Sequence, residues 1–405
     1  MSAVDCSFII LCSMLVMLMT PALALFYGGL VRSRNVLSTT MHSFSLLGLV
    51  SILWAVLGFS LAFGPDSLGL IGDLSQSFLN GVGSGPSPYA ESIPAALFMI
   101  FQCMFAVLTV ALVSGAYAER IHFPAMLLFS ALWLLLVYAP MAHWVWGRGW
   151  LANLGALDFA GGTVVHMTSG AGALAAAHVL GPRLELKGGG KSPIVPHNLP
   201  MTLLGCGLLW FGWFGFNSGS ALSAGPLAAH ALVATHLAAA AGIIGWLAVE
   251  WVYSGKPTTL GAASGALAGL VAITPGAGFV GLLPAVVIGL FGGMVCYGAV
   301  MLKIRLGYDD ALDVVGIHGA GGTWGCLATG LFATSAVNGV DGLFFGQAGQ
   351  MWPQLLSVLA AWGYGYFASR ILLLFTDKLI GLRVRPETEL AGLDISEHNE
   401  RGYQI

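Results

Sequence analysis

The chain has 405 residues, of which 57% are hydrophobic and only 8% are charged, and its formal net charge is −3. Soluble domains usually carry roughly 25% charged residues, so a soluble enzyme of this length is excluded as the leading interpretation. The lack of a basic excess argues against nucleic acid as a partner. Since about ten to twelve spans of ~20 apolar residues would account for most of the hydrophobic positions, the composition indicates a polytopic membrane protein.

Apolar runs between loop signals predict eleven membrane-spanning helices. In chain order they lie at residues 8–30, 42–64, 94–117, 123–142, 160–181, 199–219, 228–252, 258–275, 279–302, 313–334 and 352–381. The first run lacks a basic segment before it, is long enough to span and follows Asp5. We therefore expect a retained first helix and not a cleaved signal peptide.

The basic residues are distributed unequally between the two sides of the predicted membrane. The loops after odd-numbered helices and the tail contain nearly all of them: Arg32, Arg34, Arg120, Arg183, Lys187, Lys191, Lys256, Lys303, Arg305, Arg383, Arg385 and Arg401. The loops after even-numbered helices contain only Arg148. Because basic loops stay in the cytoplasm, the N-terminus is predicted to lie outside and the C-terminus inside.

Two segments, five predicted helices apart, share a spacing. DFAGGTVVH (158–166) and DALDVVGIH (310–318) each place an Asp eight residues before a His, and small residues follow each His. Because five is odd, the second copy would cross the membrane in the opposite direction, and inverted repeats place a substrate path at their interface. The sequence thus predicts an all-α fold in which helices 1–5 and 6–10 form inverted repeats and a long C-terminal helix is peripheral. Residues 1–381 would form the transmembrane domain and 382–405 a cytoplasmic tail; a chance match in a Gly-rich sequence is the alternative.

His166 and His318 are the strongest candidates for a functional pair. Each lies several residues inside an apolar helix, where an unpaired imidazole is costly, and the repeat would bring both rings to the centre of the protein. Neutral rings can satisfy each other through an N–H···N hydrogen bond, and such a pair can pass a proton or bind a small polar solute. A structural pair bonded to backbone carbonyls is the alternative.

Asp158 and a group of aromatic residues mark the predicted outer side. Asp158 begins a helix, where its carboxylate can cap backbone N–H groups, stabilise an approaching cation, or do both. A membrane-interface belt explains most of the aromatic residues, but a Trp face beside a hydroxyl can also bind a small cation. Bulky rings and small residues alternate at 212–220, as at a constriction beside a polar pocket. No metal-ligand spacing or enzyme motif is present, so we expect no metal, no cofactor and no enzymatic activity.

The motif DFAGGTVVH at 158–166 resembles the signature of ammonium transporters, the Amt family of the Amt/Mep/Rh superfamily. Further matches run along the whole chain in the family's order, at 26–35, 115–120, 139–146, 196–200, 212–217 and 381–403. The resemblance implies the same eleven helices and inverted repeat, a homotrimer, and one hydrophobic pore in each subunit.

The resemblance also assigns roles to individual residues. Trp146, Phe105 and Ser220 match the outer site that recruits ammonium, and Asp158 matches the acid that supports recruitment without touching the substrate. Phe105 and Phe216 match the stacked rings that block the pore, and His166 and His318 match the twin histidines below them. Two matches to pore-lining positions are weaker, Tyr27 and Phe101. In the implied mechanism ammonium is deprotonated near the gate, and ammonia and a proton pass the histidines separately.

One residue departs from the family pattern. Arg148 lies two residues after Trp146, in an outer turn where family members often have small residues. A cation that pointed into the vestibule would oppose recruitment of ammonium, so we expect solvent or Asp158 to hold the guanidinium away.

The resemblance implies membrane lipids and a cytoplasmic PII-type signal protein as partners, and a location in the cell (plasma or inner) membrane. Two alternative functions remain: an ammonium sensor, which we expect to carry an appended signalling domain that the short tail does not provide, and an Rh-like channel for ammonia or CO₂. Trp146 favours recruitment of a charged substrate over the gas channel.

Overall fold

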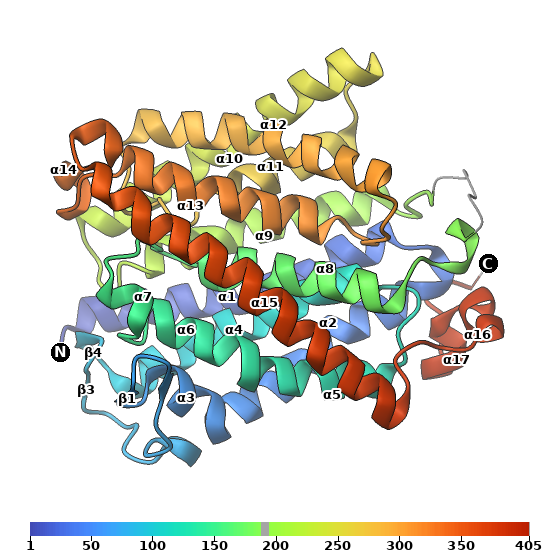
Figure 1. Cartoon of the computed structure of the whole chain (residues 1–405), viewed down its shortest axis with the longest axis horizontal. Coiled ribbons are helices and arrows are strands. Elements are labelled where there is room, and N and C mark those ends of the chain that lie inside the picture. The colour runs from blue at the N-terminus through green and yellow to red at the C-terminus, as the bar shows by residue number, and fades with distance from the viewer. Residues whose placement is uncertain (188–193, 405) are drawn as a thin grey trace.

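The computed structural model describes residues 1–187 and 194–404, so Lys191 of the predicted orientation pattern lies outside the described residues. The long helices lie side by side, and the two termini lie at opposite ends of the bundle (Figure 1). We call these ends the N-terminal face and the C-terminal face. The helices run between the two faces, as expected for segments that cross a membrane.

The first half contains five helical spans, three of which are interrupted by π-helical turns. Its helices are α1 (Ala3–Leu30), α2 (Val36–Leu53), α3 (Phe59–Phe63), α4 (Ala95–Tyr117), α5 (Phe123–Trp133), α6 (Ala139–Val145), α7 (Trp150–Asn153) and α8 (Thr168–Leu180). The π-helical turns are Trp54–Gly58 between α2 and α3, Leu134–Tyr138 between α5 and α6, and Gly162–Met167 before α8.

The second half repeats this arrangement and is followed by a long last helix. Its helices are α9 (Leu199–Gly219), α10 (Pro226–Ser254), α11 (Thr259–Ile273), α12 (Leu282–Leu306), α13 (Gly321–Phe332), α14 (Ser335–Asn338), α15 (Met351–Ile380), α16 (Pro386–Ala391) and α17 (Leu393–His398). A π-helical turn, Val315–Ala320, precedes α13. Within the described residues nine helices are long and apolar enough to span a membrane, and α11 and the interrupted segment 315–332 complete the eleven. The prediction of eleven helices is confirmed.

Two helices begin earlier than their apolar runs suggest. The first helix starts at Ala3 and not at residue 8, and the second starts at Val36 and not at 42. Residues 38–43 are mostly Ser, Thr and His, which interrupt an apolar run without interrupting a helix. Polar residues of this kind are tolerated in a helix that packs against neighbours, and Ser38, Thr39, His42 and Ser43 are all buried.

The loop between α3 and α4 contains two small antiparallel hairpins. Strand β1 (Asp66–Ser67) pairs with β2 (Ile71–Gly72), and β3 (Pro86–Ser87) pairs with β4 (Ala90–Pro94). The N–H of Ser2 donates to Ser92 O at 2.7 Å, which ties the N-terminus to this loop at the N-terminal face. The predicted all-α class is confirmed, because these strands belong only to a loop.

Glycine allows the two halves to approach closely at the centre. A Cβ atom at Gly170 in α8 would lie 2.4 Å from the Cα atom of Gly319, and one at Gly205 in α9 would lie 2.4 Å from the backbone nitrogen of Phe26 in α1. Both distances are too short for any other residue, so backbones touch where α8 crosses the π-helical turn before α13. Some of the 57 glycines of the chain therefore lie where the two inverted halves meet.

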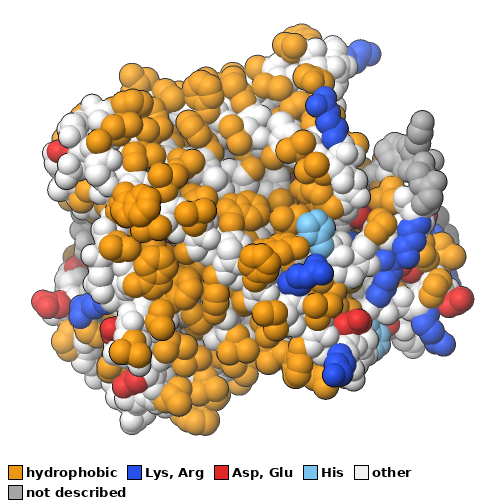
Figure 2. Space-filling model, in the orientation of Figure 1, with side chains coloured by type: hydrophobic (Ala, Val, Ile, Leu, Met, Phe, Trp, Pro, Cys, Tyr) orange, Lys and Arg blue, Asp and Glu red, His pale blue; other side chains and the backbone are white. Residues whose placement is uncertain are grey.

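The surface is sorted by polarity along the helix direction. Figure 2 shows hydrophobic side chains over the middle of the bundle and most Lys and Arg side chains at the end where α16 and α17 lie. Exposed large hydrophobic residues on α15 include Trp352, Leu359, Phe367 and Ile371. An exposed apolar band of this extent is expected where lipid replaces water, so the chain is a multi-pass membrane protein.

The C-terminal tail folds back against the C-terminal face. The N–H of Leu393 donates to Asn35 Oδ1 and the N–H of Ser38 donates to Asp394 Oδ1, both at 2.8 Å. The hydroxyl of Tyr403 lies 2.8 Å from His197 Nε2. The described part of the tail is therefore packed against the helix bundle.

Candidate functional site

Asp158 organises the start of the fifth span. Its carboxylate accepts hydrogen bonds from the N–H groups of Gly161 (2.8 Å), Gly162 (2.6 Å), Thr163 (2.8 Å) and Val164 (3.1 Å). Four N–H groups at a helix N-terminus form a strong anion site, so the carboxylate acts as the cap. Its side chain is buried and does not line the outer cavity described below, so the capping role is the one that the contacts support.

Asp310 stands in the equivalent place of the tenth span but has fewer partners. Its Oδ2 atom accepts from Val315 N at 2.7 Å, and its Oδ1 atom has no hydrogen-bond partner among the described residues. Lys303 donates to the Asp310 carbonyl at 2.7 Å and pairs with Asp313 at 2.5 Å. The two copies therefore share the Asp–His spacing but not the same cap.

The two predicted histidines meet at the centre of the protein. The Nδ1 atoms of His166 and His318 lie 3.2 Å apart, and the ring centroids are 5.2 Å apart with an interplanar angle of 24°. Only one nitrogen of such a contact can donate, so the geometry fits two neutral rings joined by one N–H···N hydrogen bond. The pairing of His166 with His318 thus has the form expected from the repeat, and it lies beside the Gly170–Gly319 crossing.

A narrow central cavity runs along the histidine pair. Its volume of about 10 Å³ corresponds to roughly one water-sized molecule. Leucine, isoleucine, methionine and aromatic side chains form most of its lining, and the polar groups are those of His166, His318, Tyr27 and Trp213. The Tyr27 hydroxyl donates to Leu112 O at 3.1 Å, and the Trp213 indole donates to Thr274 Oγ1 at 2.9 Å. Both donors are therefore already used, so among the described lining residues the N–H group still free to donate belongs to the histidine pair, while the Tyr27 oxygen can still accept.

Two stacked phenylalanine rings separate this cavity from the N-terminal face. The centroids of Phe105 and Phe216 lie 4.1 Å apart at an interplanar angle of 26°, and both side chains are buried. Phe216 also stacks at 6.3 Å on His166, on the side toward the centre. Phe101 contacts Phe105 edge-on at 4.9 Å but lines neither the outer nor the central cavity. The stacked pair is thus a closed aromatic barrier in this conformation.

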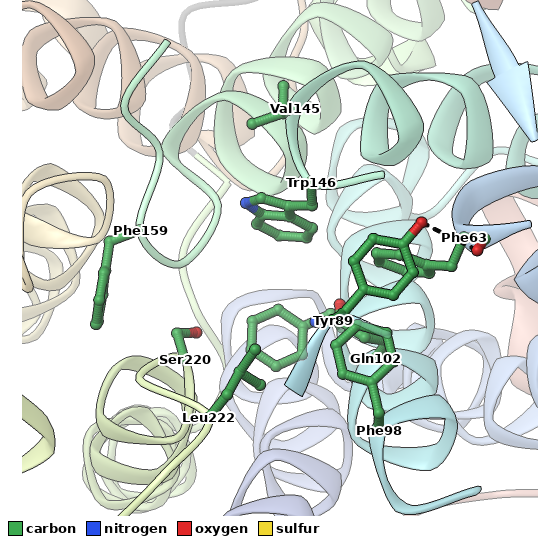
Figure 3. A pocket seen from close by; sticks show the side chains of 10 residues that line it. Phe63, Tyr89, Phe98, Gln102, Val145, Trp146, Phe159, Ser220 and Leu222 are labelled. Atoms are coloured by element: carbon green, nitrogen blue, oxygen red, sulfur yellow. Dashed lines mark hydrogen bonds between the residues drawn. The ribbon is translucent and has the colours of Figure 1, made fainter. Parts of the chain in front are cut away.

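A second cavity lies on the other side of the barrier, at the N-terminal face, and has a volume of about 250 Å³. We call it the outer cavity. Figure 3 shows Trp146, Ser220 and Gln102 around it, and Phe105 forms its inner end. The rings of Phe105 and Trp146 are perpendicular to each other, with their centroids 5.9 Å apart. The hydroxyl of Ser220 donates to Phe216 O at 2.9 Å, which leaves its oxygen lone pairs available as acceptors.

Several residues of this cavity were not among the candidates from the sequence. They are Phe63, Tyr89, Phe98, Gln102, Val145, Phe159 and Leu222. Most lie in loops or look like ordinary core residues, so no spacing marks them. Gln102 did carry a signal, because it is a polar residue within the apolar run of α4 and remains buried with an unpartnered Oε1 atom among the described residues.

Arg148 is held away from the outer cavity, but not by the groups expected. Its Nη2 atom donates to Pro88 O at 2.6 Å, and its guanidinium carbon lies 5.0 Å from the centroid of the Tyr89 ring. Neither Asp158 nor solvent alone fixes the side chain. The expectation missed Pro88 and Tyr89 because the hairpin between β3 and β4 is 60 residues away in sequence.

The comparisons with known proteins agree with these features. The sequence profile of the Ammonium Transporter Family matches residues 7–403. The chain is 54% identical over 403 residues to a Bacillus subtilis protein named ammonium transporter, covering 99% of this chain and 98% of that protein. It is 46% identical to ammonium transporter Amt1 of Archaeoglobus fulgidus, over the full length of both.

Solved structures share the same architecture. The crystal structure of Saccharomyces cerevisiae Mep2 matches with a TM-score of 0.90 and 38% identity, covering 96% of this chain and 88% of that chain. A structure described as a sensor Amt protein matches with a TM-score of 0.91 and 31% identity, covering 98% of both chains. From the family profile, the relatives and the fold together, the chain belongs to the Ammonium Transporter Family.

Proposed function

We propose that this protein transports ammonium by binding the ion in the outer cavity, removing its proton near the aromatic barrier, and conducting ammonia along the histidine pair. One observation carries the proposal most strongly. A cavity with room for several water molecules is separated by stacked Phe105 and Phe216 from an otherwise largely apolar passage of about 10 Å³ that is lined by two histidines. This change in size and polarity suits a substrate that is charged outside and neutral inside.

Recruitment would use groups that replace the water around a small cation. The Trp146 indole and the Phe105 ring offer π faces, and Ser220 offers a hydroxyl oxygen. A cation over an aromatic face gains about 0.5–2 kcal/mol, depending on how far water is excluded. No charged side chain is among the residues that line the outer cavity in the described part of the chain, so binding would be moderate and reversible.

Deprotonation would solve the problem of the narrow passage. A charge placed at the middle of a bilayer costs from about 3 to more than 10 kcal/mol, and a passage as wide as one water molecule cannot carry a hydration shell. Neutral ammonia avoids this cost and can accept a hydrogen bond from an imidazole N–H. The proton would follow separately, with the 3.2 Å contact between His166 and His318 as its route, or the pair would chiefly shape the passage.

The same mechanism would exclude K⁺, because K⁺ has no proton to lose and would have to cross the passage as a bare cation. Selectivity would therefore arise at the entrance to the passage and not from tight binding in the outer cavity. This separates the two roles: the outer cavity sets the affinity for ammonium, and the passage sets the exclusion of metal ions.

The test is uptake and current in proteoliposomes under an ammonium gradient, for the wild-type protein and for His166→Asp and His318→Glu. We expect saturable, ammonium-selective flux that both substitutions damage. Thermal unfolding in detergent serves as the control for folding. Equal flux for K⁺, or tight ammonium binding without flux, would overturn the transporter mechanism.

Further parts of the proposal concern location and assembly. The charge distribution supports an N-terminus outside and a C-terminus in the cytoplasm, with residues 1–381 in the plasma or inner membrane and 382–405 as the cytoplasmic tail. The exposed apolar face provides surface for lipid and for two further subunits in a homotrimer. A PII-type protein would bind at the C-terminal face, where the tail is docked.

The orientation can be tested separately. Cysteines introduced at the N-terminal and C-terminal faces should react with a membrane-impermeant reagent from outside and from the cytoplasm, respectively.

Two alternatives remain testable. The likeness to a structure described as a sensor Amt protein keeps a sensing role open, because transport and sensing can use the same fold. A sensor would bind ammonium with little flux, and an Rh-like gas channel would conduct ammonia or CO₂ without saturation and without dependence on Trp146. The uptake assay distinguishes all three.

A further inference from the structure

Arg148 occupies an unusual backbone conformation beside the outer cavity. Its φ angle is +66°, a region that residues other than glycine rarely adopt. The turn is fixed on both sides, because Gly149 N donates to His143 O at 2.9 Å and the Arg148 carbonyl accepts from Asn153 Nδ2 at 3.2 Å. Because a long side chain occupies a position suited to glycine, we infer that the side chain itself has a role there.

The side chain of Arg148 joins two elements that enclose the outer cavity. Its own turn ends α6 and lies two residues after Trp146. Its guanidinium reaches the hairpin of β3 and β4, where it donates to Pro88 O and covers the ring of Tyr89. One side chain thus connects the segment that carries the Trp146 face with the segment that carries the Tyr89 wall.

Several contacts hold Tyr89 in addition to the guanidinium of Arg148. It lies in the two-residue connection between β3 and β4, its hydroxyl donates to Phe63 O at 3.0 Å, and its ring stacks on Phe98 at 5.2 Å and 9°. Both Phe63 and Phe98 also line the cavity. A ring at the tip of an exposed hairpin stays in place only if neighbours hold it, and the guanidinium supplies a planar group that can both stack and donate.

We propose that Arg148 is a positioning residue that fixes the Tyr89 wall of the outer cavity and thereby limits the size of the ammonium ion that the cavity admits. This inference rests on the proposed function of the outer cavity. With the wall fixed, an ion bearing a methyl group competes with the ring for space. With the wall released, Tyr89 can move outward and make room for that methyl group.

The charge of Arg148 has a second, separable consequence. It is a positive group in direct contact with the wall of a cavity whose lining has no charged side chain among the described residues. Repulsion between it and an arriving cation would raise the ammonium concentration needed for half-maximal uptake, and salt would screen the effect. Lysine at this position keeps the charge but lacks the planar fork, so it separates clamping from repulsion.

The experiment compares ammonium and methylammonium uptake in proteoliposomes for Arg148→Lys, Arg148→Gln and Arg148→Gly. We expect the ratio of methylammonium to ammonium kcat/KM to rise about threefold to tenfold in all three, a part of the roughly 10–200-fold discrimination that one methylene commands in a fitted pocket. The KM for ammonium at low salt should fall in the Gln and Gly variants but not in the Lys variant. Arg148→Gly relieves the positive φ, so a raised ratio without a lower unfolding temperature rules out a general loss of structure.

Tyr89→Ala provides the decisive background. If Arg148 acts through the ring, Arg148→Gln should change the ratio no further once the ring is gone. An unchanged ratio in the single variants, or the same rise in the Tyr89→Ala background, would overturn the inference. A wild-type protein without saturable ammonium uptake would instead refute the proposed function. Calorimetric titration in detergent then gives the ratio of the dissociation constants for methylammonium and ammonium directly. Equal ratios for wild type and Arg148→Gln, or no binding of either ion, would reject the inference as well.

Discussion

The two inverted copies share one sequence pattern but differ at the ends where each helix begins. Asp158 accepts hydrogen bonds from four backbone N–H groups and lies beside a cavity that has no charged lining residue in the described part of the chain. Asp310 accepts fewer and lies among Lys303, Asp313 and other charged groups. A repeat can therefore preserve the broken helix and its histidine while each end is adapted separately. The helix start of the first copy lies at the outer cavity, here called the mouth. The helix start of the second copy lies at the C-terminal face beside a network of ion pairs from both halves, Arg32, Glu119, Arg183 and Asp309, here called the base.

The base is held by a network of ion pairs. Glu119 pairs with Arg32 at 2.8 Å and with Arg183 at 2.7 Å, and Arg183 also binds Asp309 at 2.8 Å. Burial alone would raise the pKa of Glu119, but Arg32 and Arg183 together lower it to about 2. Burial raises the pKa of Asp310 to about 6, and the neighbouring Asp313 adds to the rise while Lys303 opposes it. At the C-terminal face, protonation of Glu119 therefore destabilises the fold, whereas protonation of Asp310 stabilises it.

The largest effect should follow from disrupting the contact between the two copies, where the backbones of Gly170 and Gly319 cross. Gly170→Leu would force a side chain into the backbone of Gly319, from which even a Cβ atom would be only 2.4 Å away. We expect a loss of more than about 3 kcal/mol in stability and no detectable ammonium flux, because overpacking would displace both histidines. The matched control is Gly48→Leu in α2, where a Cβ atom meets nothing within 4 Å. Equal thermal stability of the two variants in detergent would contradict the crossing.

Acidification should act selectively on the base. The folded pKa of Glu119 and that of Asp309 are about 2, below the ~4 of unfolded carboxylates, so the folded state binds fewer protons. Their stabilisation is therefore present above about pH 5 and is lost as the pH falls through about 4 toward 2. Between pH 6 and pH 3 these two carboxylates should together lose about 3 kcal/mol of stabilisation. Protonation of Asp310, whose folded pKa is about 6, stabilises the fold over the same range and offsets most of that loss. Denaturation in detergent at both pH values separates the two effects: the wild-type protein should lose about 1.5 kcal/mol more on acidification than Glu119→Gln, and no such difference should separate it from the exposed Glu91→Gln.

The two capping aspartates should respond differently to the same change. In Asp158→Asn an amide NH₂ would face backbone N–H groups, leaving donors unsatisfied at a cost of about 2–3 kcal/mol and reducing flux at least tenfold. Asp310→Asn should cost about 1 kcal/mol, because one oxygen already lacks a partner among the described residues. Uptake and unfolding measured side by side give the comparison. If the two variants lose equal activity and stability, the ends are not specialised.

A smaller effect should show that the outer cavity sets the affinity for ammonium. Trp146→Leu removes a π face while the passage keeps its form, so KM for ammonium should rise about tenfold, equivalent to about 1.4 kcal/mol. Exclusion of K⁺ should persist. A variant that gains K⁺ current would show that the outer cavity, and not the passage, determines selectivity.

Ser220→Ala should have the smallest effect. It removes one acceptor of the outer cavity without changing the ring faces, so a two- to threefold rise in KM is expected, about 0.5 kcal/mol. Initial uptake rates over a range of ammonium concentrations measure it. Ser223→Ala, in an exposed turn three residues later, is the control and should leave KM unchanged.

Much of this molecule was readable from the sequence for physical reasons. Apolar runs predicted the helices because span length and hydrophobicity are local properties. The Asp–His spacing, repeated in two distant segments, predicted that His166 and His318 would meet, because an inverted repeat brings equivalent positions together at the centre. The cap formed by Asp158 was also predicted, from its place at the start of a helix. The stacking of Phe105 on Phe216 was implied by the family resemblance alone, and the π-helical turns had no local signal. The contact of Arg148 with Pro88 and Tyr89 depends on how a distant hairpin folds over the mouth, so only the structure reveals it.

In the proposed mechanism ammonium loses its proton before it enters the passage along the histidines. K⁺ current and ammonium uptake recorded in the same proteoliposomes under equal inward gradients test this step. Deprotonation before the passage predicts saturable ammonium uptake with no K⁺ current above that of protein-free vesicles. A K⁺ current that rises with protein content and matches the ammonium flux would contradict it, because a bare cation would then be crossing the passage along His166 and His318.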